Sequence, residues 1–159
     1  KSLKMKRLAI LWLSFLACAV TLSAQNPLNA EADSILGEYE VRHQGEYTKV
    51  RVTKDTDGTY RAQVYWVEER LDDKGNLRLD KKNPDKSLRH VPCDEIVLFK
   101  GLKYDQDKCR WGGTNVYDPT RGIRANVICV FMDDGSLRVK GHLLGFSQSI
   151  YWKPIRKIL

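Results

Sequence analysis

The chain has 159 residues, of which 42% are hydrophobic and 30% are charged, and its formal net charge is +7. Four of its 27 basic residues and none of its 20 acidic residues lie in the first 24 positions, so the net charge of the remainder is only +3. Acidic and basic residues alternate along the polar segments instead of forming a basic cluster, which argues against a nucleic-acid-binding protein. The length suits one domain with a real core, and no repeat or linker divides the chain.

Residues 1–24 are predicted to be a secretory signal peptide. A basic start precedes an apolar run from Leu8 to Leu22, and the small residues Ser23 and Ala24 follow, so we expect cleavage after Ala24. A membrane anchor is the alternative, but the run is shorter than the about 20 apolar residues that cross a bilayer. "FLAC" offers a second alternative, lipidation at Cys18. We therefore expect an exported protein, periplasmic or extracellular, with residues 25–159 as a single β-barrel domain and no stable membrane span.

The rest of the chain is predicted to be almost entirely β-strand. "NAEADSIL", residues 29–36, can form a short helical segment that Gly37 ends. Apolar and polar residues then alternate with period two, as in "TYRAQVYWV", where Tyr60, Ala62, Val64 and Trp66 share one face. The same pattern predicts about eight strands, near Glu38–Arg42, Tyr47–Thr53, Thr59–Val67, Glu95–Leu102, Cys109–Tyr117, Ile123–Met132, Ser136–Leu143 and Ser149–Pro154.

Three segments that end in glycine are predicted to be turns between these strands. They are "DTDG" (residues 55–58), "DPTRG" (118–122) and "DDG" (133–135), because glycine adopts positive φ without a steric cost. Residues 68–91 form one long polar connection. A connection of that length without regular structure is typically functional or mobile.

An all-β, up-and-down antiparallel barrel is the predicted fold. Consecutive hairpins leave two exposed edges unless the sheet closes, and closure removes both. Eight strands enclose an interior that side chains can just fill or that holds one small ligand. A flattened sandwich is the alternative architecture. The barrel requires Tyr60, Val127 and Trp152 to point inward.

The chain resembles a bacterial exported family catalogued as domain of unknown function 2147, over about residues 33–154. The residues that carry the resemblance are Asp33, Ile35, Gly37, Asn83-Pro84-Asp85, Trp111-Gly112-Gly113, Tyr117-Asp118-Pro119, Gly122, Val139-Lys140-Gly141 and Trp152. The resemblance implies a lipocalin-like barrel whose bottom a short helix and an aromatic residue close. Two positions depart from the family: Tyr39 stands where a tryptophan is usual, and Asp94 where a glycine is common.

Candidate ligand-binding residues are the aromatic residues of the predicted interior and the polar residues of the "DPTRG" turn. They are Tyr60, Trp66, Trp111, Tyr117, Asp118, Arg121 and Phe131. Pockets for small molecules are mostly apolar with a few placed polar groups, which this set could supply. Asp118 equally accepts backbone hydrogen bonds in its own turn, and the aromatic residues equally fill a core.

Other kinds of site find little support. Cys93 and Cys109 could form a disulfide after export, although both could also be unpaired packing residues. Asp80, Asn83 and Asp85 in "DKKNPD" lack the pattern of a calcium loop and are expected to form an Asn-Pro turn whose acids face water. The three histidines show no metal-ligand spacing, no nucleophile motif occurs, and no cofactor is expected.

The most direct functional hypothesis is a binding module of the bacterial envelope for a small apolar or amphipathic ligand, without catalysis. A barrel packed solid that serves as a structural or interaction module is the first alternative. A hydrolase or isomerase that uses a carboxylate at the open end is the second.

Overall fold

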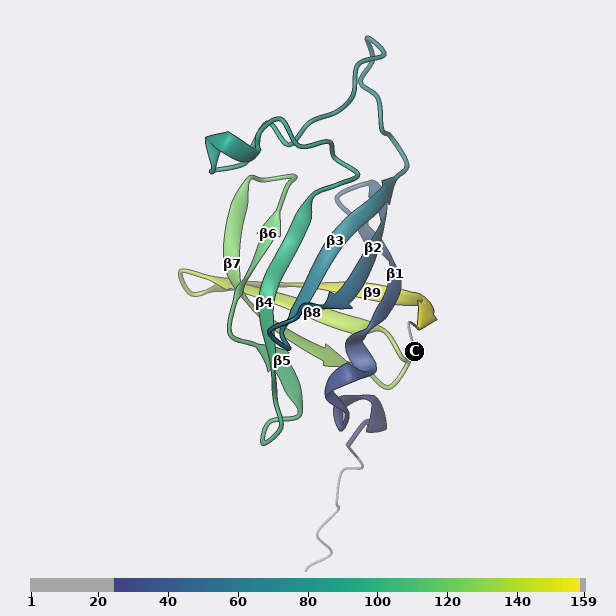
Figure 1. Cartoon of the computed structure of the whole chain (residues 1–159), viewed down its shortest axis with the longest axis vertical. Helices are drawn as coiled ribbons and strands as arrows, with labels where there is room; N and C mark the ends of the chain where they lie inside the picture. Colours follow the sequence, from purple (N-terminus) through teal and green to yellow (C-terminus); the bar gives the residue numbers. More distant parts are fainter. Residues whose placement is uncertain (1–24, 158–159) are drawn as a thin grey trace, which may run out of the picture.

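The computed structural model describes residues 25–157, so the predicted leader and Cys18 lie outside the described residues. Three short 3-10 helices and nine strands make up the fold (Figure 1). In chain order these are η1 (Pro27–Asn29), η2 (Ala32–Ile35), β1 (Gly37–His43), β2 (Glu46–Lys54), β3 (Tyr60–Val67), η3 (Lys86–Leu88), β4 (Val97–Asp105), β5 (Arg110–Gly112), β6 (Asn115–Asp118), β7 (Ile123–Phe131), β8 (Leu137–Leu143) and β9 (Phe146–Lys157).

The strands form one antiparallel sheet that closes into a barrel. Their order is β5-β4-β3-β2-β1-β9-β8-β7-β6, and a further pairing of β5 with β7, at Trp111 and Cys129, completes the ring. The predicted strand 109–117 is two strands, because Gly113 has φ +81° and breaks it between β5 and β6. β5 and β6 are therefore two halves of one strand of the barrel, and the nine strands form a closed eight-stranded barrel. This confirms the expected architecture.

Side chains alternate across the barrel wall as the period of two predicts. Tyr60, Val127 and Trp152 are all buried, which confirms the three inward positions on which the barrel prediction depended. The predicted turns also form: Gly58, Gly122 and Gly135 each have positive φ. Turns at Gln44-Gly45 and Leu144-Gly145, which join β1 to β2 and β8 to β9, were not predicted.

Trp66 is the exception to the alternation, and its predicted inward position is wrong. The register of β2 and β3 shifts between Lys49 and Val50, so that Lys49 pairs with Trp66 but Val50 pairs with Val64. A β-bulge of this kind inserts one residue and reverses the faces that follow. Trp66 is consequently 38% exposed. It packs on the outer wall, where the Nζ atom of Lys49 lies 5.0 Å from the centre of its ring.

The N-terminal segment closes the lower end of the barrel in Figure 1. The single short helix expected at residues 29–36 is instead the two 3-10 turns η1 and η2. The side-chain amide of Asn29 makes two hydrogen bonds with the backbone of Phe131. Its Nδ2 donates to the Phe131 carbonyl at 2.9 Å, and its Oδ1 accepts from the Phe131 N–H at 2.7 Å. Ile35 of η2 is fully buried in the core. We call residues 25–36 the plug.

Aromatic residues of the strands bind the plug from inside the barrel. The indole Nε1 of Trp111 donates to the Ala32 carbonyl at 2.9 Å, and the Tyr60 hydroxyl donates to Asp33 Oδ1 at 2.6 Å. The Tyr39 hydroxyl donates to the Ile35 carbonyl at 2.7 Å. Tyr39 therefore seals this end with its polar atom satisfied, as a buried tyrosine requires.

The long connection between β3 and β4 is folded. It contains η3 and two isolated bridges, Leu71 with Leu77 and Leu79 with Pro92. In Figure 1 it extends above the end of the barrel that lies opposite the plug. Within residues 25–157, no helix has the length and apolar content that a membrane span requires.

Of the two alternatives for Cys93 and Cys109, the structure has the unpaired one: no disulfide joins them, and all three described cysteines are free. Cys93 precedes β4 and Cys109 follows it, so the length of that strand separates the two thiols. A bridge needs Cα atoms within about 7 Å of each other, which a nine-residue strand does not allow. Cys129 lies in the core, where burial raises the pKa of its thiol.

Replacing Asn29 by alanine is expected to destabilise the barrel at the plug. The change removes both hydrogen bonds to the Phe131 backbone and leaves buried polar groups without partners. We expect a loss of about 2 to 3 kcal/mol in the free energy of unfolding, measured by urea denaturation. The control is Asn126→Ala, at an exposed position of β7, for which a change within about 0.5 kcal/mol is expected. Equal effects of the two substitutions would contradict the role assigned to Asn29.

Candidate ligand-binding cavity

A cavity of about 1010 Å³ occupies the barrel on the side opposite the plug. Its walls are mainly apolar side chains from the inner faces of the strands. Those of the deeper wall are Val41, Val64, Leu98, Val116, Ala125, Val139, Ile150 and Trp152. The volume falls at the upper end of the range for pockets that enclose a drug-sized ligand.

Trp152 of β9 forms the floor of the cavity. Its ring stacks on Phe99 with centroids 6.0 Å apart and planes 5° apart, and its other neighbour is Tyr39 at 5.9 Å. Tyr39 in turn holds the plug through its hydroxyl. The three rings therefore separate the sealed end of the barrel from the open part, and they fix the depth to which a ligand can reach.

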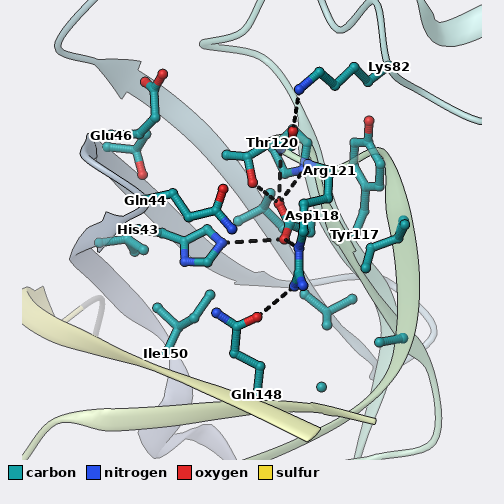
Figure 2. Close-up of a pocket in the computed structure, with 18 of the residues that line it drawn as sticks. His43, Gln44, Glu46, Lys82, Tyr117, Asp118, Thr120, Arg121, Gln148 and Ile150 are labelled. Atoms are coloured by element: carbon teal, nitrogen blue, oxygen red, sulfur yellow. Dashed lines mark hydrogen bonds and ion pairs between the residues drawn. The ribbon is translucent and has the colours of Figure 1, made fainter. Parts of the chain in front are cut away.

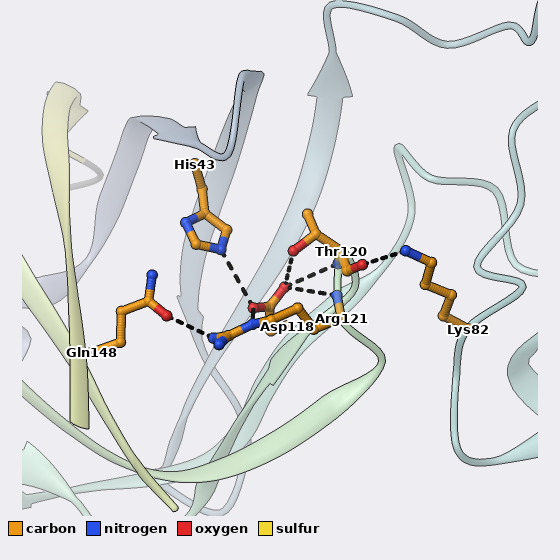
Figure 3. A network of polar contacts seen from close by, with 6 residues as sticks. All are labelled: His43, Lys82, Asp118, Thr120, Arg121 and Gln148. Atoms are coloured by element: carbon orange, nitrogen blue, oxygen red, sulfur yellow. Dashed lines mark hydrogen bonds and ion pairs between the residues drawn. The ribbon is translucent and has the colours of Figure 1, made fainter. Parts of the chain in front are cut away.

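Polar side chains from four elements meet at the mouth of the cavity (Figure 2). Asp118, at the end of β6, is the centre of the group: its Oδ2 accepts from Arg121 Nε at 2.7 Å and lies 3.3 Å from Nε2 of His43. Arg121 also donates to Oε1 of Gln148 on β9 at 2.7 Å. We call His43, Asp118, Thr120, Arg121 and Gln148 the mouth cluster, and Figure 3 shows its continuous network.

The charge of Asp118 is fixed by these partners. Burial acts to raise the pKa of its carboxyl group, but hydrogen bonds from Thr120 and Arg121 and the nearby His43 outweigh it and lower the pKa to about 2. Oδ1 accepts from the Thr120 hydroxyl at 2.6 Å and from the Thr120 N–H at 2.9 Å. The carboxylate thus stabilises its own turn, as expected, and also links β1 to that turn across the mouth.

The long connection is attached to the same turn. We call residues 78–83 the rim segment. Asp80 is buried, and its two carboxylate oxygens accept from the Tyr117 hydroxyl and from Asn83 Nδ2, each at 2.6 Å. Lys82 Nζ donates to the Thr120 carbonyl at 2.5 Å. At Gly122 the backbone touches the rim segment so closely that a Cβ atom would overlap the Lys82 carbonyl oxygen.

Two of the motifs singled out in the sequence, "DKKNPD" and "YDPTRG", therefore bind each other. Asp80 accepts from the Tyr117 hydroxyl and is held in place by Asn83, whereas Asp85 accepts from the Ser87 N–H at 2.9 Å at the start of η3. Asp85 is exposed and has the local turn role that was expected. The expectation that Asp80 faces water is wrong, because Asp80 is buried against Tyr117 of β6. Among residues 25–157, no three histidine, cysteine or acidic side chains lie close enough together to hold a metal ion.

The seven candidate ligand-binding residues fall into three groups. Tyr117, Asp118 and Arg121 line the cavity. Tyr60, Trp111 and Phe131 are buried at the plug and do not line it, because the plug occupies that part of the interior. Trp66 lies on the outer wall. Trp152, which we expected to point inward, lies at the cavity floor.

His43 and Gln148 are site residues that sequence reasoning missed. His43 is separated from Asp118 by 75 positions in the chain. The only sequence signal was its place before Gln44-Gly45, at the end of a predicted strand. Strand ends on one side of a barrel converge, but which of them meet depends on the register, and the sequence does not reveal it.

Comparison with known proteins agrees with this architecture. A family model described as an uncharacterised protein conserved in bacteria, DUF2147, matches residues 37–154. A solved structure of the protein HP1028 from Helicobacter pylori, described as belonging to the lipocalin family, is similar with a TM-score of 0.57 and 20% sequence identity. The similarity covers 76% of this chain and 82% of that one. No curated protein sequence matches the chain.

Replacing Gly122 by alanine is expected to detach the rim segment. The substitution forces a Cβ atom against the Lys82 carbonyl at a residue whose φ is +69°. The control is Gly113→Ala, where φ is +81° but no atom lies within 4 Å of the added Cβ. Both variants incur the backbone cost of about 1 to 2 kcal/mol, but only Gly122→Ala should increase hydrogen exchange across residues 78–91. Equal exchange in the two variants would show that the close contact does not hold the segment.

Asp118→Asn is expected to destabilise the protein in a pH-dependent way. A carboxyl group whose pKa is lower in the folded state contributes stability above its unfolded pKa, and the contribution is lost as the pH falls through the folded value. For Asp118 that window runs from about 4 to about 2. Near neutral pH the variant should lose about 1.5 to 3 kcal/mol, typical of a hydrogen bond to a charged group. Thermal unfolding at a series of pH values measures the difference in the free energy of unfolding between the wild-type protein and the variant. This difference should shrink as the pH falls through the window. A difference that stays constant down to pH 2 would contradict the assignment.

Proposed function

The chain belongs to the DUF2147 family of uncharacterised bacterial proteins, and on the basis of its lipocalin-like barrel we propose that it is an exported binding protein for one small apolar or amphipathic molecule. The observation that carries the proposal is the cavity of about 1010 Å³, with apolar walls and a polar mouth.

The distribution of polar groups supports an amphipathic ligand bound in one direction. An apolar tail would lie against Val64, Val139 and Ile150 and end at Trp152. A polar head would lie among the mouth cluster, where Arg121 and Gln148 offer donors and acceptors to water and ligand alike. Burial of each methylene group of such a tail contributes about 0.8 kcal/mol.

The cavity favours binding over the alternatives. A barrel packed solid would leave no space of this size between the strands. A general acid would need a carboxyl group with a raised pKa, whereas partners hold the pKa of Asp118 at about 2. The mouth cluster therefore suits recognition and positioning, and we assign it no covalent reaction.

Export rests on the sequence. The order of a basic start, an apolar run and small residues before Gln25 is that of a secretory signal peptide. We place the mature protein in the periplasm or outside the cell, where a carrier for poorly soluble molecules would have both water and membranes within reach.

Binding can be tested with a dansyl-labelled fatty acid and a variant that fills the cavity. Ala125 lines the cavity from β7, so Ala125→Trp should occupy the space that the probe needs. We expect the wild-type protein to bind the probe with a blue-shifted fluorescence, and the variant to bind it at least about tenfold more weakly. Native mass spectrometry of protein purified gently from its own envelope should show a bound molecule of lipid-like mass.

Asn126→Trp is the matched control, because Asn126 is the exposed neighbour of Ala125 on the same strand. This substitution adds the same ring on the outer face and should leave probe affinity unchanged. A wild-type protein that binds neither the probe nor any molecule from its envelope would refute the proposed function.

A further inference from the structure

The turn between β8 and β9 carries large apolar side chains into solvent beside the cavity mouth. Leu143 is 39% exposed, Leu144 is 89% exposed and Phe146 is 82% exposed. All three also line the opening of the cavity. In Figure 1 this turn projects beyond the body of the barrel. We call Leu143, Leu144 and Phe146 the apolar tip.

The register of β8 and β9 makes the apolar tip a continuation of the cavity lining. On the inner face, Leu137 pairs with Trp152 and Val139 pairs with Ile150 at depth. Gly141 with Gln148 and then Leu143 with Phe146 follow on the same face toward the turn. Because pairs two residues apart share a face, the lining runs from the floor, past the mouth, into solvent. Gln148 of the mouth cluster is the polar side chain on this face, so an amphiphile can move along one surface from outside to inside with its polar group near the mouth.

Leu144 is unfavourable for folding in two ways. Its φ is +48° at a tight turn, a conformation that asparagine or glycine adopts more readily than leucine. Its side chain is also the most exposed of the large apolar residues in the described chain. The other hairpin at the mouth has the polar Gln44 at the equivalent position before its glycine. A residue that lowers stability locally and exposes apolar surface is typical of a functional site.

Cations lie at the same opening. Lys81 and Lys82 of the rim segment are exposed and line the mouth. Neither has a carboxylate partner among residues 25–157, and Lys82 Nζ also donates to the Thr120 carbonyl. The acidic side chains nearby are already bound within the protein. Asp80 is bound to Tyr117 and Asn83, Asp118 to Arg121, and Glu46 to Arg78.

From this combination we propose that the mouth docks on an anionic lipid bilayer. The apolar tip inserts among the acyl chains, Lys81 and Lys82 contact the lipid headgroups, and the continuous lining takes up an amphiphile directly from the membrane. The inference deepens the proposed function, on which it rests for the nature of the cargo. Docking by a few apolar residues and a basic patch is reversible, as transfer of a lipid-like molecule requires.

Co-sedimentation with vesicles tests the docking surface. The purified protein is mixed with vesicles of phosphatidylcholine alone or of an equal mixture with phosphatidylglycerol. We expect it to sediment with the anionic vesicles, and the double variant Leu144→Asn, Phe146→Ser to partition at least about tenfold more weakly. Asparagine suits the left-handed turn, so the variant should keep its folded stability. Lys81→Glu, which leaves the contact of Lys82 with Thr120 in place, should also weaken binding by about tenfold, as added salt should.

The control is Ile155→Ser, which removes an apolar side chain, 45% exposed, from the opposite end of β9. It should sediment like the wild-type protein. If the wild-type protein does not sediment, or if the tip variant or the lysine variant sediments as well as the wild type, the inference is overturned. Ala125→Trp, which blocks the cavity, should still sediment. Vesicle binding without probe binding would therefore refute the proposed function while leaving the docking surface intact.

Discussion

Trp111 carries the contact on which the rest of the structure depends. Its backbone pairs with Cys129 and closes the sheet into a ring. Its indole N–H holds the Ala32 carbonyl of the plug, and its ring packs at 82° against Phe131, with centroids 5.7 Å apart. One residue thus removes the free edges of the sheet and seals one end of the barrel. Because that end is filled by plug and aromatic rings, only the other end can admit a ligand.

The two ends of the barrel differ in the way their polar atoms are used. At the plug, Asn29, Tyr39 and Trp111 each bond a backbone group, and the result is a packed, water-excluding seal. At the mouth, Asp118 and Asp80 bond side chains and loops to one another around an opening. The mouth is therefore shaped by a network of polar contacts over an apolar lining, an arrangement that suits a binding site.

Much of the fold could be predicted from the sequence, because period-two alternation and glycine turns are local signals. Tyr60, Val127 and Trp152 follow the alternation and point inward as predicted. Trp66 does not, since a single bulge, invisible in one strand's sequence, reverses the face that follows. The site was less predictable. Asp118 was found through its turn motif, but its contact with His43 depends on how strand ends converge across the barrel. The plug divides the candidate aromatic residues between the sealed end and the cavity. The resemblance implied that a short helix closes the barrel bottom, but not how many of the inward rings it covers.

The pairing of β1 with β9 determines the order in which the barrel can be completed. These strands bracket the other seven in the sequence, and Gly37 pairs with Lys157. The pairs β1–β2, β2–β3, β7–β8 and β8–β9 are hairpins that can form as the chain emerges, and β4 joins β3 after the long connection. The pairing of β1 with β9, in contrast, requires the whole domain. A nascent chain consequently presents two unpaired strand edges, those of β1 and β8, until β9 arrives, and unpaired edges of this kind promote aggregation.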